Sequence, residues 1–316
     1  IVAACCELAV PRSRVRRKEN YLINQRRLQA CDRALEKLRS KKRISDDDML
    51  EVLRMWSFGE NRVRRNVCPD GQEWVYSDTM GLIHSRGLGT CVESQLSKRF
   101  PEVMRFVSQW ARDRGPKRKV GDKSMPFPFT SINLNFAYAA KMHRDRNNSG
   151  PSMIRALGEF EGGKLGYFPD DDHSLPVEFL PVERRELVDI RQAFRIFDGR
   201  RGHCVEEFIG ERFSVVFFTC RSYNDASVEL RNKIMSCGAV WPSLPAFTAF
   251  SRQIPAPRGY PDVVVTPAAT GRKRSAMQAG ESDEDEEDAA PPRKLSKTAS
   301  KTGRRLSHKT SAAGRR

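Results

Sequence analysis

The stretch INLNFAYAAKMHRDRNN, residues 132–148, places a histidine two positions before an aspartate. A second stretch, RGHCVEEFIGERFSVVFF, residues 201–218, carries a histidine nine residues before an arginine that opens an apolar run. The segment TSINLNFAY, residues 130–138, alternates in part between apolar and polar side chains, and RFSVVFFT, residues 212–219, is a short apolar run; both are typical of strands. Both histidines are therefore expected to lie beside strands of one folded domain.

The chain between residues 129 and 223 predicts a fold built from short strands. Short apolar runs recur there, and Gly, Asp and Pro separate them. The segments RALGEF and KLGYF flank Gly162 and Gly163, which we interpret as the turn of a hairpin. Strands at this spacing are typical of a sandwich or a jelly roll. We therefore predict an α+β protein with a jelly-roll core and helices packed outside it.

Helices are expected on both sides of the strand-rich region. Residues 19–40 carry apolar side chains at spacings of three and four, which indicates an amphipathic helix. Ser45 precedes three aspartates and is expected to cap a second helix. Residues 101–113 and 224–238 predict further N-terminal and C-terminal helices. Residues 112–128 are rich in Gly, Pro and Lys and are expected to form a loop.

The distribution of charge divides the chain into three parts. The formal net charge is +16, and the first 66 residues hold 17 basic and 9 acidic side chains. Residues 271–316 hold 12 basic and 7 acidic side chains, and the middle is nearly balanced. We predict a basic helical segment over residues 1–66, a folded domain over 67–250 and a disordered charged tail over 251–316. Basic ends favour a polyanion such as nucleic acid, with solvated faces as the alternative.

Cysteine usage and hydropathy argue against several classes of protein. None of the eight cysteines forms a C-x-x-C pair, so a zinc ribbon or a thioredoxin-like site is not expected. Free thiols in a reducing compartment are the interpretation we prefer. Residues 1–10 are apolar but too few to span a bilayer, and no other run is long enough. The chain begins at Ile1 rather than Met, so we expect a fragment or a processed product.

His143 and Asp145 form a pattern that points to a metal ion. Residues i and i+2 of an extended segment project from the same face, so an imidazole nitrogen and a carboxylate oxygen can meet at one ion. A third ligand must come from another strand, and His203 is the main candidate. His173 is the alternative, although it follows an acidic run that we interpret as a solvated loop. Two histidines and one carboxylate are the ligands of non-haem iron(II) oxygenases.

Arg212 opens the strand that is expected to follow His203 after a turn at Gly210. A guanidinium stays charged and binds a carboxylate with a planar fork, and a buried guanidinium needs such a partner. The distal carboxylate of 2-oxoglutarate would supply that partner. The 2-oxo acid end of the same molecule would occupy coordination positions that the protein ligands leave open.

These stretches resemble the 2-oxoglutarate- and iron(II)-dependent dioxygenases of the TET and J-binding-protein group. The shared features are an asparagine-bearing strand, H-x-D followed by asparagine, the stretch GEFEGGKL, and a distal histidine with an arginine-led strand. The resemblance covers roughly residues 129–223. The long cysteine-rich zinc region of animal members and the second DNA-binding module of J-binding proteins are not evident. The N-terminal helices would therefore do any additional DNA binding.

The resemblance implies a double-stranded β-helix, a cupin-like form of the jelly roll. It also implies that His143, Asp145 and His203 are the catalytic iron(II) ligands and that Arg212 binds 2-oxoglutarate. Further candidates are a cosubstrate contact at Tyr138 and substrate contacts at Asn133, Asn135 and Asn147. Core packing is the alternative role for the tyrosine, and strand-edge or turn hydrogen bonds are the alternative for the asparagines.

Members of this group oxidise the methyl group of 5-methylcytosine or thymine in DNA. The resemblance implies the same reaction here, with Fe(II) and 2-oxoglutarate as cofactors and DNA as the partner; a role for ascorbate stays open. A base in a duplex would first have to be flipped out, at a cost of roughly a few kcal/mol. One alternative is a prolyl-type protein hydroxylase of the same superfamily, and another is a catalytically dead nucleic-acid-binding module.

The stretches GRKR and PPRK flank an acidic block in the tail. Basic clusters of this kind are typical of nuclear localisation signals, so we expect the protein in the nucleus. A solubilising tail is the alternative interpretation.

Overall fold

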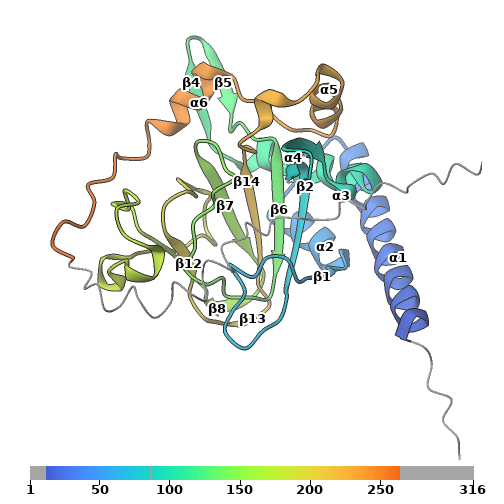
Figure 1. Cartoon of the computed structure of the whole chain (residues 1–316). Coiled ribbons are helices and arrows are strands. Elements are labelled where there is room, and N and C mark those ends of the chain that lie inside the picture. The colour runs from blue at the N-terminus through green and yellow to red at the C-terminus, as the bar shows by residue number, and fades with distance from the viewer. Residues whose placement is uncertain (1–11, 86, 264–316) are drawn as a thin grey trace, which may run out of the picture.

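A computed structural model of the chain describes residues 12–85 and 87–263 (Figure 1). Its largest element is a seven-stranded sheet in the order β1-β2-β6-β14-β7-β11, with β3 paired to β2 beside this path. The strands of this sheet are β1 (Glu60–Asn61), β2 (Val75–Ser85), β3 (Thr90–Glu93), β6 (Ser131–Phe136), β7 (Ser152–Leu157), β11 (Arg195–Phe197) and β14 (Phe213–Phe218).

Three smaller sheets accompany the large one. They are β10 (Glu186–Val188), β9 (Leu165–Tyr167) and β12 (His203–Val205); β8 (Phe160–Gly162) and β13 (Phe208–Gly210); and β4 (Lys117–Val120) and β5 (Lys123–Pro126). All strand pairings in the described residues are antiparallel. The protein thus combines helices with antiparallel sheets, an arrangement compatible with a jelly-roll core. The described strands form no closed barrel.

Helices cover one face of the large sheet and its upper end in Figure 1. They are α1 (Arg12–Arg39), α2 (Asp46–Met55), α3 (Gln95–Arg99), α4 (Pro101–Arg114), α5 (Val228–Ser236) and α6 (Leu244–Ser251), with short 3-10 turns η1 (Val177–Phe179), η2 (Val182–Arg184) and η3 (Tyr223–Asp225). Ser45 caps α2 as expected, because its hydroxyl accepts from Asp48 N while the Asp48 carboxylate accepts from Ser45 N. None of the helices in the described part has the length and apolar character needed to cross a bilayer.

Alternation along β6 and β14 gives the large sheet two different faces. The apolar face packs against α1, α2 and α4, and its buried residues include Ile132, Leu134, Val215 and Phe217. The alternating polar residues of the same two strands, Asn133, Asn135 and Ser214, line a cavity on the opposite face. Because successive side chains of a strand point to opposite faces, one strand pair builds both the core and the wall of a cavity. That cavity lies between the large sheet and β9 and β12.

The N-terminal helices share the main core of the protein. Ala30, Ala34 and Trp56 are buried in the same apolar cluster as Phe217. Arg27 on α1 donates to Asp78 on β2 at 2.7 Å, and both side chains are buried. Trp56 Nε1 also donates to Asp78 at 2.7 Å. Helix α1 is therefore bound to one face of β2, and the opposite face of β2 contributes Thr79 to the cavity.

Replacing Asp78 with asparagine is expected to lower the free energy of unfolding by roughly 3–5 kcal/mol, because the Arg27 charge stays buried without its carboxylate. Urea unfolding measures the change. The matched control is Asp262→Asn, which breaks an exposed pair with Arg184 and should leave the free energy of unfolding nearly unchanged. Equal effects of both substitutions would contradict the prediction.

Two expectations about local structure were wrong. Residues 112–128 are not a loop throughout, because β4 and β5 pair within them. Gly162 and Gly163 do not form the turn of a hairpin, since β8 pairs with β13 whereas β9 pairs with β10 and β12. The positive φ angles of these glycines, 79° and 61°, instead let the chain pass from one sheet to another.

The segment 251–263, which we expected to begin a disordered tail, packs against the domain. Tyr260 is buried in an apolar cluster with Phe168, and Arg258 pairs with Asp170 at 2.9 Å. Residues 264–316 lie outside the described residues, so the expected disorder of that part stays a prediction.

Candidate active site

Backbone pairing brings the two histidine-bearing stretches together. His143 N donates to His203 O at 2.9 Å, and His203 N donates to His143 O at 3.0 Å. Asp145 N donates to Gly199 O at 2.8 Å. These bonds align residues 143–145 antiparallel to 199–203, so side chains about 60 residues apart in the chain face one space.

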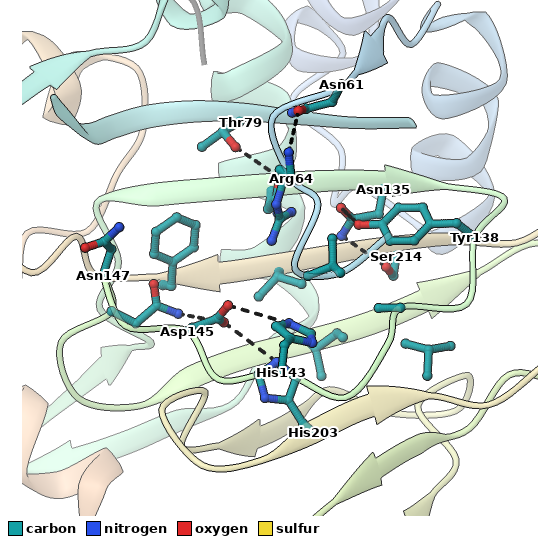
Figure 2. A pocket seen from close by; sticks show the side chains of 18 of the residues that line it. Asn61, Arg64, Thr79, Asn135, Tyr138, His143, Asp145, Asn147, His203 and Ser214 are labelled. Atoms are coloured by element: carbon teal, nitrogen blue, oxygen red, sulfur yellow. Dashed lines mark hydrogen bonds and ion pairs between the residues drawn. The ribbon is translucent and has the colours of Figure 1, made fainter. Parts of the chain in front are cut away.

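His143, Asp145 and His203 converge on this space (Figure 2). The distance from His143 Nε2 to Asp145 Oδ1 is 3.7 Å, and that from His203 Nε2 to Asp145 Oδ2 is 3.8 Å. Both histidines are buried. In the described residues this is the one group of three or more His, Cys, Asp or Glu side chains arranged to hold a metal ion. The arrangement fits Fe(II), which two imidazoles and one carboxylate bind with coordination positions left open.

Hydrogen bonds orient both imidazoles for metal binding. His143 Nδ1 lies 2.7 Å from Lys141 O, and His203 Nδ1 lies 2.9 Å from Arg201 O. A carbonyl oxygen can only accept, so each Nδ1 carries the proton and each Nε2 presents a lone pair to the site. Burial, together with the neighbouring His203, lowers the pKa of His143 well below its usual value. The neutral imidazole that coordinates a metal is thus the favoured form.

Asn148 holds the carboxylate of Asp145. Its Nδ2 donates to Asp145 Oδ2 at 2.9 Å and lies 3.4 Å from Ser152 Oγ. A Cβ atom at Gly199 would lie 3.0 Å from the same Oδ2, so a glycine leaves room for this contact. The residue expected from the sequence was the adjacent Asn147 instead. The spacing of three residues after the aspartate was the available signal, because a turn returns position i+3 toward position i.

His173, the alternative third ligand, does not belong to this group. It is exposed, does not line the cavity, and has a positive φ of 70°. Its backbone N–H donates to Asp171 Oδ1 at 3.0 Å. His84, to which the sequence analysis assigned no role, does line the cavity, with Nδ1 at 3.1 Å from Ser222 Oγ.

Arg212 lines the same cavity and is 2 % exposed. Among the residues the structure describes, its Nε and Nη2 atoms have no hydrogen-bond partner. The rings of Phe160 and Phe208 lie 5.3 Å from its guanidinium carbon. Burial lowers the pKa of Arg212 to about 10, so the group stays charged at neutral pH. Gly163 makes room for it, because a Cβ there would lie 2.7 Å from Nε.

A buried guanidinium without a carboxylate partner is costly, and an anionic ligand would remove that cost. The same cavity offers the three candidate metal ligands. A molecule with a carboxylate at one end and a metal-chelating 2-oxo acid at the other suits both features, as 2-oxoglutarate does.

Tyr138 and Asn135 are hydrogen-bonded to each other along the wall of the cavity. Tyr138 Oη donates to Asn135 Oδ1 at 2.7 Å, and Asn135 Nδ2 donates to Ser214 Oγ at 3.3 Å. Burial raises the pKa of Tyr138, which keeps the phenol protonated as a donor. These bonds fit the alternative structural roles as well as ligand contacts, so the predicted cosubstrate and substrate roles stay predictions.

Asn133 and Asn147 also line the cavity. The Asn133 amide lies 3.1 Å from the hydroxyls of Ser77 and Thr79, and Asn147 O accepts from Arg221 N at 2.7 Å. Their predicted substrate roles likewise stay predictions.

Arg64 is a cavity residue that the sequence analysis missed. It comes from the loop between β1 and β2, and Figure 2 shows its side chain reaching toward the three candidate ligands. Arg64 Nη1 donates to Ser77 Oγ at 2.9 Å. The loop is fastened by Asn61, whose Oδ1 accepts from Val63 N and Arg64 N. Because we had assigned residues 1–66 to a separate segment, no sequence signal connected Arg64 to the site.

No protein-family model and no curated protein matches the chain. Several solved structures are similar to parts of it, and two of them are the following. One is NgTET1 in complex with 5mC DNA, at 13 % identity and a TM-score of 0.31, with 46 % of this chain and 61 % of that chain covered. The other is a 2OG-Fe(II) oxygenase family oxidoreductase from Burkholderia pseudomallei, at 16 % identity and a TM-score of 0.33, with 55 % and 77 % covered. Neither likeness is close enough to bear on the function of this chain.

Proposed function

We propose that this protein is an Fe(II)- and 2-oxoglutarate-dependent dioxygenase. The observation that carries the proposal is one cavity lined by two complementary features. Two buried imidazoles and a carboxylate converge in it, and the buried guanidinium of Arg212 lines it with two nitrogen atoms that have no hydrogen-bond partner among the described residues. We include in the proposal the double-stranded β-helix, of which the large sheet and the β10-β9-β12 sheet would be the two halves.

His143, Asp145 and His203 would hold Fe(II), and Arg212 would hold the distal carboxylate of 2-oxoglutarate. When bound, this pair activates dioxygen and supplies the oxidising power for a C–H bond, with release of succinate and carbon dioxide. The chain contributes position and environment. The Nδ1 bonds to Lys141 and Arg201 fix the imidazoles, Asn148 fixes the carboxylate, and the apolar rings of Phe160 and Phe208 limit access of water to Arg212.

The proposed substrate is a methylated or modified pyrimidine base in DNA, 5-methylcytosine or thymine. Support comes from the sequence motifs and from the wall of the cavity, which Asn133, Asn135 and Asn147 line. Enzymes that act on a flipped base read its edge with hydrogen bonds of the kind that amide side chains form. The basic N-terminal segment supplies charge for phosphates. A nuclear location accords with this substrate and with the basic clusters of the tail.

A succinate-release assay with Fe(II) and 2-oxoglutarate tests the function. Methylated DNA, unmethylated DNA and prolyl peptides are compared side by side, with mass spectrometry of the nucleosides or peptides. We expect stimulation and an oxidised methyl group with DNA and not with prolyl peptides. A product in methylated DNA alone would identify 5-methylcytosine as the target base, whereas an oxidised thymine in both DNAs would identify thymine. Stimulation by peptide alone would overturn the DNA substrate and keep the dioxygenase. Folded protein without Fe(II)-dependent turnover of any substrate would overturn the dioxygenase.

A further inference from the structure

The loop after β9 contains a buried carboxylate to which the proposed reaction assigns no role. Asp171 is 1 % exposed, although it lies in the acidic run that we interpreted as a solvated loop. Its two neighbours behave as expected of such a loop, since Asp170 pairs with Arg258 and Asp172 accepts from Ser174. The middle residue of the run alone points inward.

Asp171 accepts four hydrogen bonds. Its Oδ1 accepts from Arg144 Nη2 at 2.5 Å and from His173 N at 3.0 Å. Its Oδ2 accepts from Arg144 Nε at 2.7 Å and from Gly202 N at 2.6 Å. The two bonds from the guanidinium form a bidentate, charge-assisted pair, which is the strongest and most directional kind available to a carboxylate.

Two of the three donor residues belong to the two segments that carry the candidate metal ligands. Arg144 stands between His143 and Asp145, and Gly202 immediately precedes His203. A Cβ atom at Gly202 would lie 2.3 Å from Leu180 Cδ1, so a larger residue there would require the Leu180 side chain to move. One buried carboxylate, which is not among the residues that line the cavity, therefore joins the H-x-D segment to the His203 segment.

We infer that Asp171 is a positioning residue that sets the separation of the metal ligands through Arg144 and Gly202. The inference rests on the proposed function, since it assumes that His143, Asp145 and His203 bind Fe(II). The backbone hydrogen bonds between His143 and His203 align the two segments but do not link them covalently. The Asp171 contacts add an ion pair and a backbone bond one residue from the ligands on each segment.

Asp171→Asn keeps the shape of the side chain but removes its charge and one acceptor oxygen. Loss of a group that orients metal ligands typically weakens metal binding by about 10–100-fold, and we expect a rise in the Fe(II) Kd within that range. Anaerobic isothermal titration calorimetry measures the Kd. The visible absorption of bound Co(II) reports a change in ligand geometry that a general loss of stability does not produce.

The matched control is Asp78→Asn, which removes the negative charge of another buried carboxylate, the ion-pair partner of Arg27 on α1. It should lower the Tm of the metal-free protein and leave both the Fe(II) Kd and the Co(II) spectrum unchanged. Arg144→Lys is the second variant, because it keeps a positive charge but loses the bidentate fork. It should weaken Fe(II) binding even if Asp171→Asn does not fold.

Fe(II) affinity and a Co(II) spectrum that stay unchanged in folded Asp171→Asn or Arg144→Lys would overturn the positioning role and leave the proposed function intact. Fe(II) binding by the unaltered chain distinguishes failure of the positioning role from failure of the proposed function. If the unaltered chain binds no Fe(II), or binds it equally well after His203→Ala, then the proposed function fails and the inference fails with it.

Discussion

His203→Ala is expected to abolish Fe(II)-dependent turnover and to raise the Fe(II) Kd by more than about 100-fold, beyond the loss caused by removing a group that only orients a ligand. The reason is geometric. His203 Nε2 faces Asp145 at 3.8 Å from a different strand, so its removal leaves the site with only the two ligands of the H-x-D segment. Calorimetry measures the Kd, and succinate release measures turnover.

His173→Ala is the matched control for this prediction. Both histidines lie within the strand-rich region of residues 129–223, but His173 is exposed and does not line the cavity. Its removal should leave the Fe(II) Kd and the turnover unchanged. Comparable losses in the two variants would show that the metal site includes the acidic loop, contrary to the geometry described above. The Tm of each metal-free variant establishes that both are folded.

Arg212→Met should raise the KM for 2-oxoglutarate by roughly 100-fold or more. The expected size follows from two charge-assisted hydrogen bonds, each contributing about 1.5 kcal/mol or more, where 1.4 kcal/mol corresponds to a tenfold change. Arg212→Lys keeps a positive charge but cannot form the two parallel hydrogen bonds of a guanidinium, so its KM for 2-oxoglutarate should lie between those of the wild type and Arg212→Met.

For Arg212→Met we also expect no loss of thermal stability when 2-oxoglutarate is absent, although cosubstrate binding is weakened. In the absence of 2-oxoglutarate, Arg212 is a buried charge without a described partner for Nε and Nη2, so Met should leave the Tm unchanged or raise it. Added 2-oxoglutarate should raise the Tm of the Fe(II)-bound wild type but not that of Arg212→Met. A large loss of stability in the ligand-free variant would mean that Arg212 supports the fold, and the cosubstrate role would then lose its basis.

Several features of the fold and of the site could be predicted because they depend on residues that are close together in the sequence. His143 and Asp145 are two positions apart in an extended segment, so their shared direction follows from strand geometry. The serine cap of α2 follows from the hydroxyl and the carboxylate three positions later. The apolar run after Arg212 predicted β14 because β-branched and aromatic residues fit a pleated surface.

Other residues carried no local signal. Asp171 reads as part of a charged loop, and only the packing of Arg144 and Gly202 against it makes it a buried junction. Arg64 reads as part of a basic segment, yet the loop between β1 and β2 brings it into the cavity. Gly162 and Gly163 carry the signal of a hairpin turn, but strands from elsewhere in the chain pair with both flanking segments.

The order of residues alone thus established several of the helices and strands, the directions of side chains within them and the chemical types available for a metal site. The tertiary structure decided which elements meet. It placed His203 opposite His143, buried Arg212 among aromatic rings and turned Asp171 inward. The physical reason is that strand register and the exclusion of water arise from contacts between distant segments, and a local pattern of residues contains no record of those contacts.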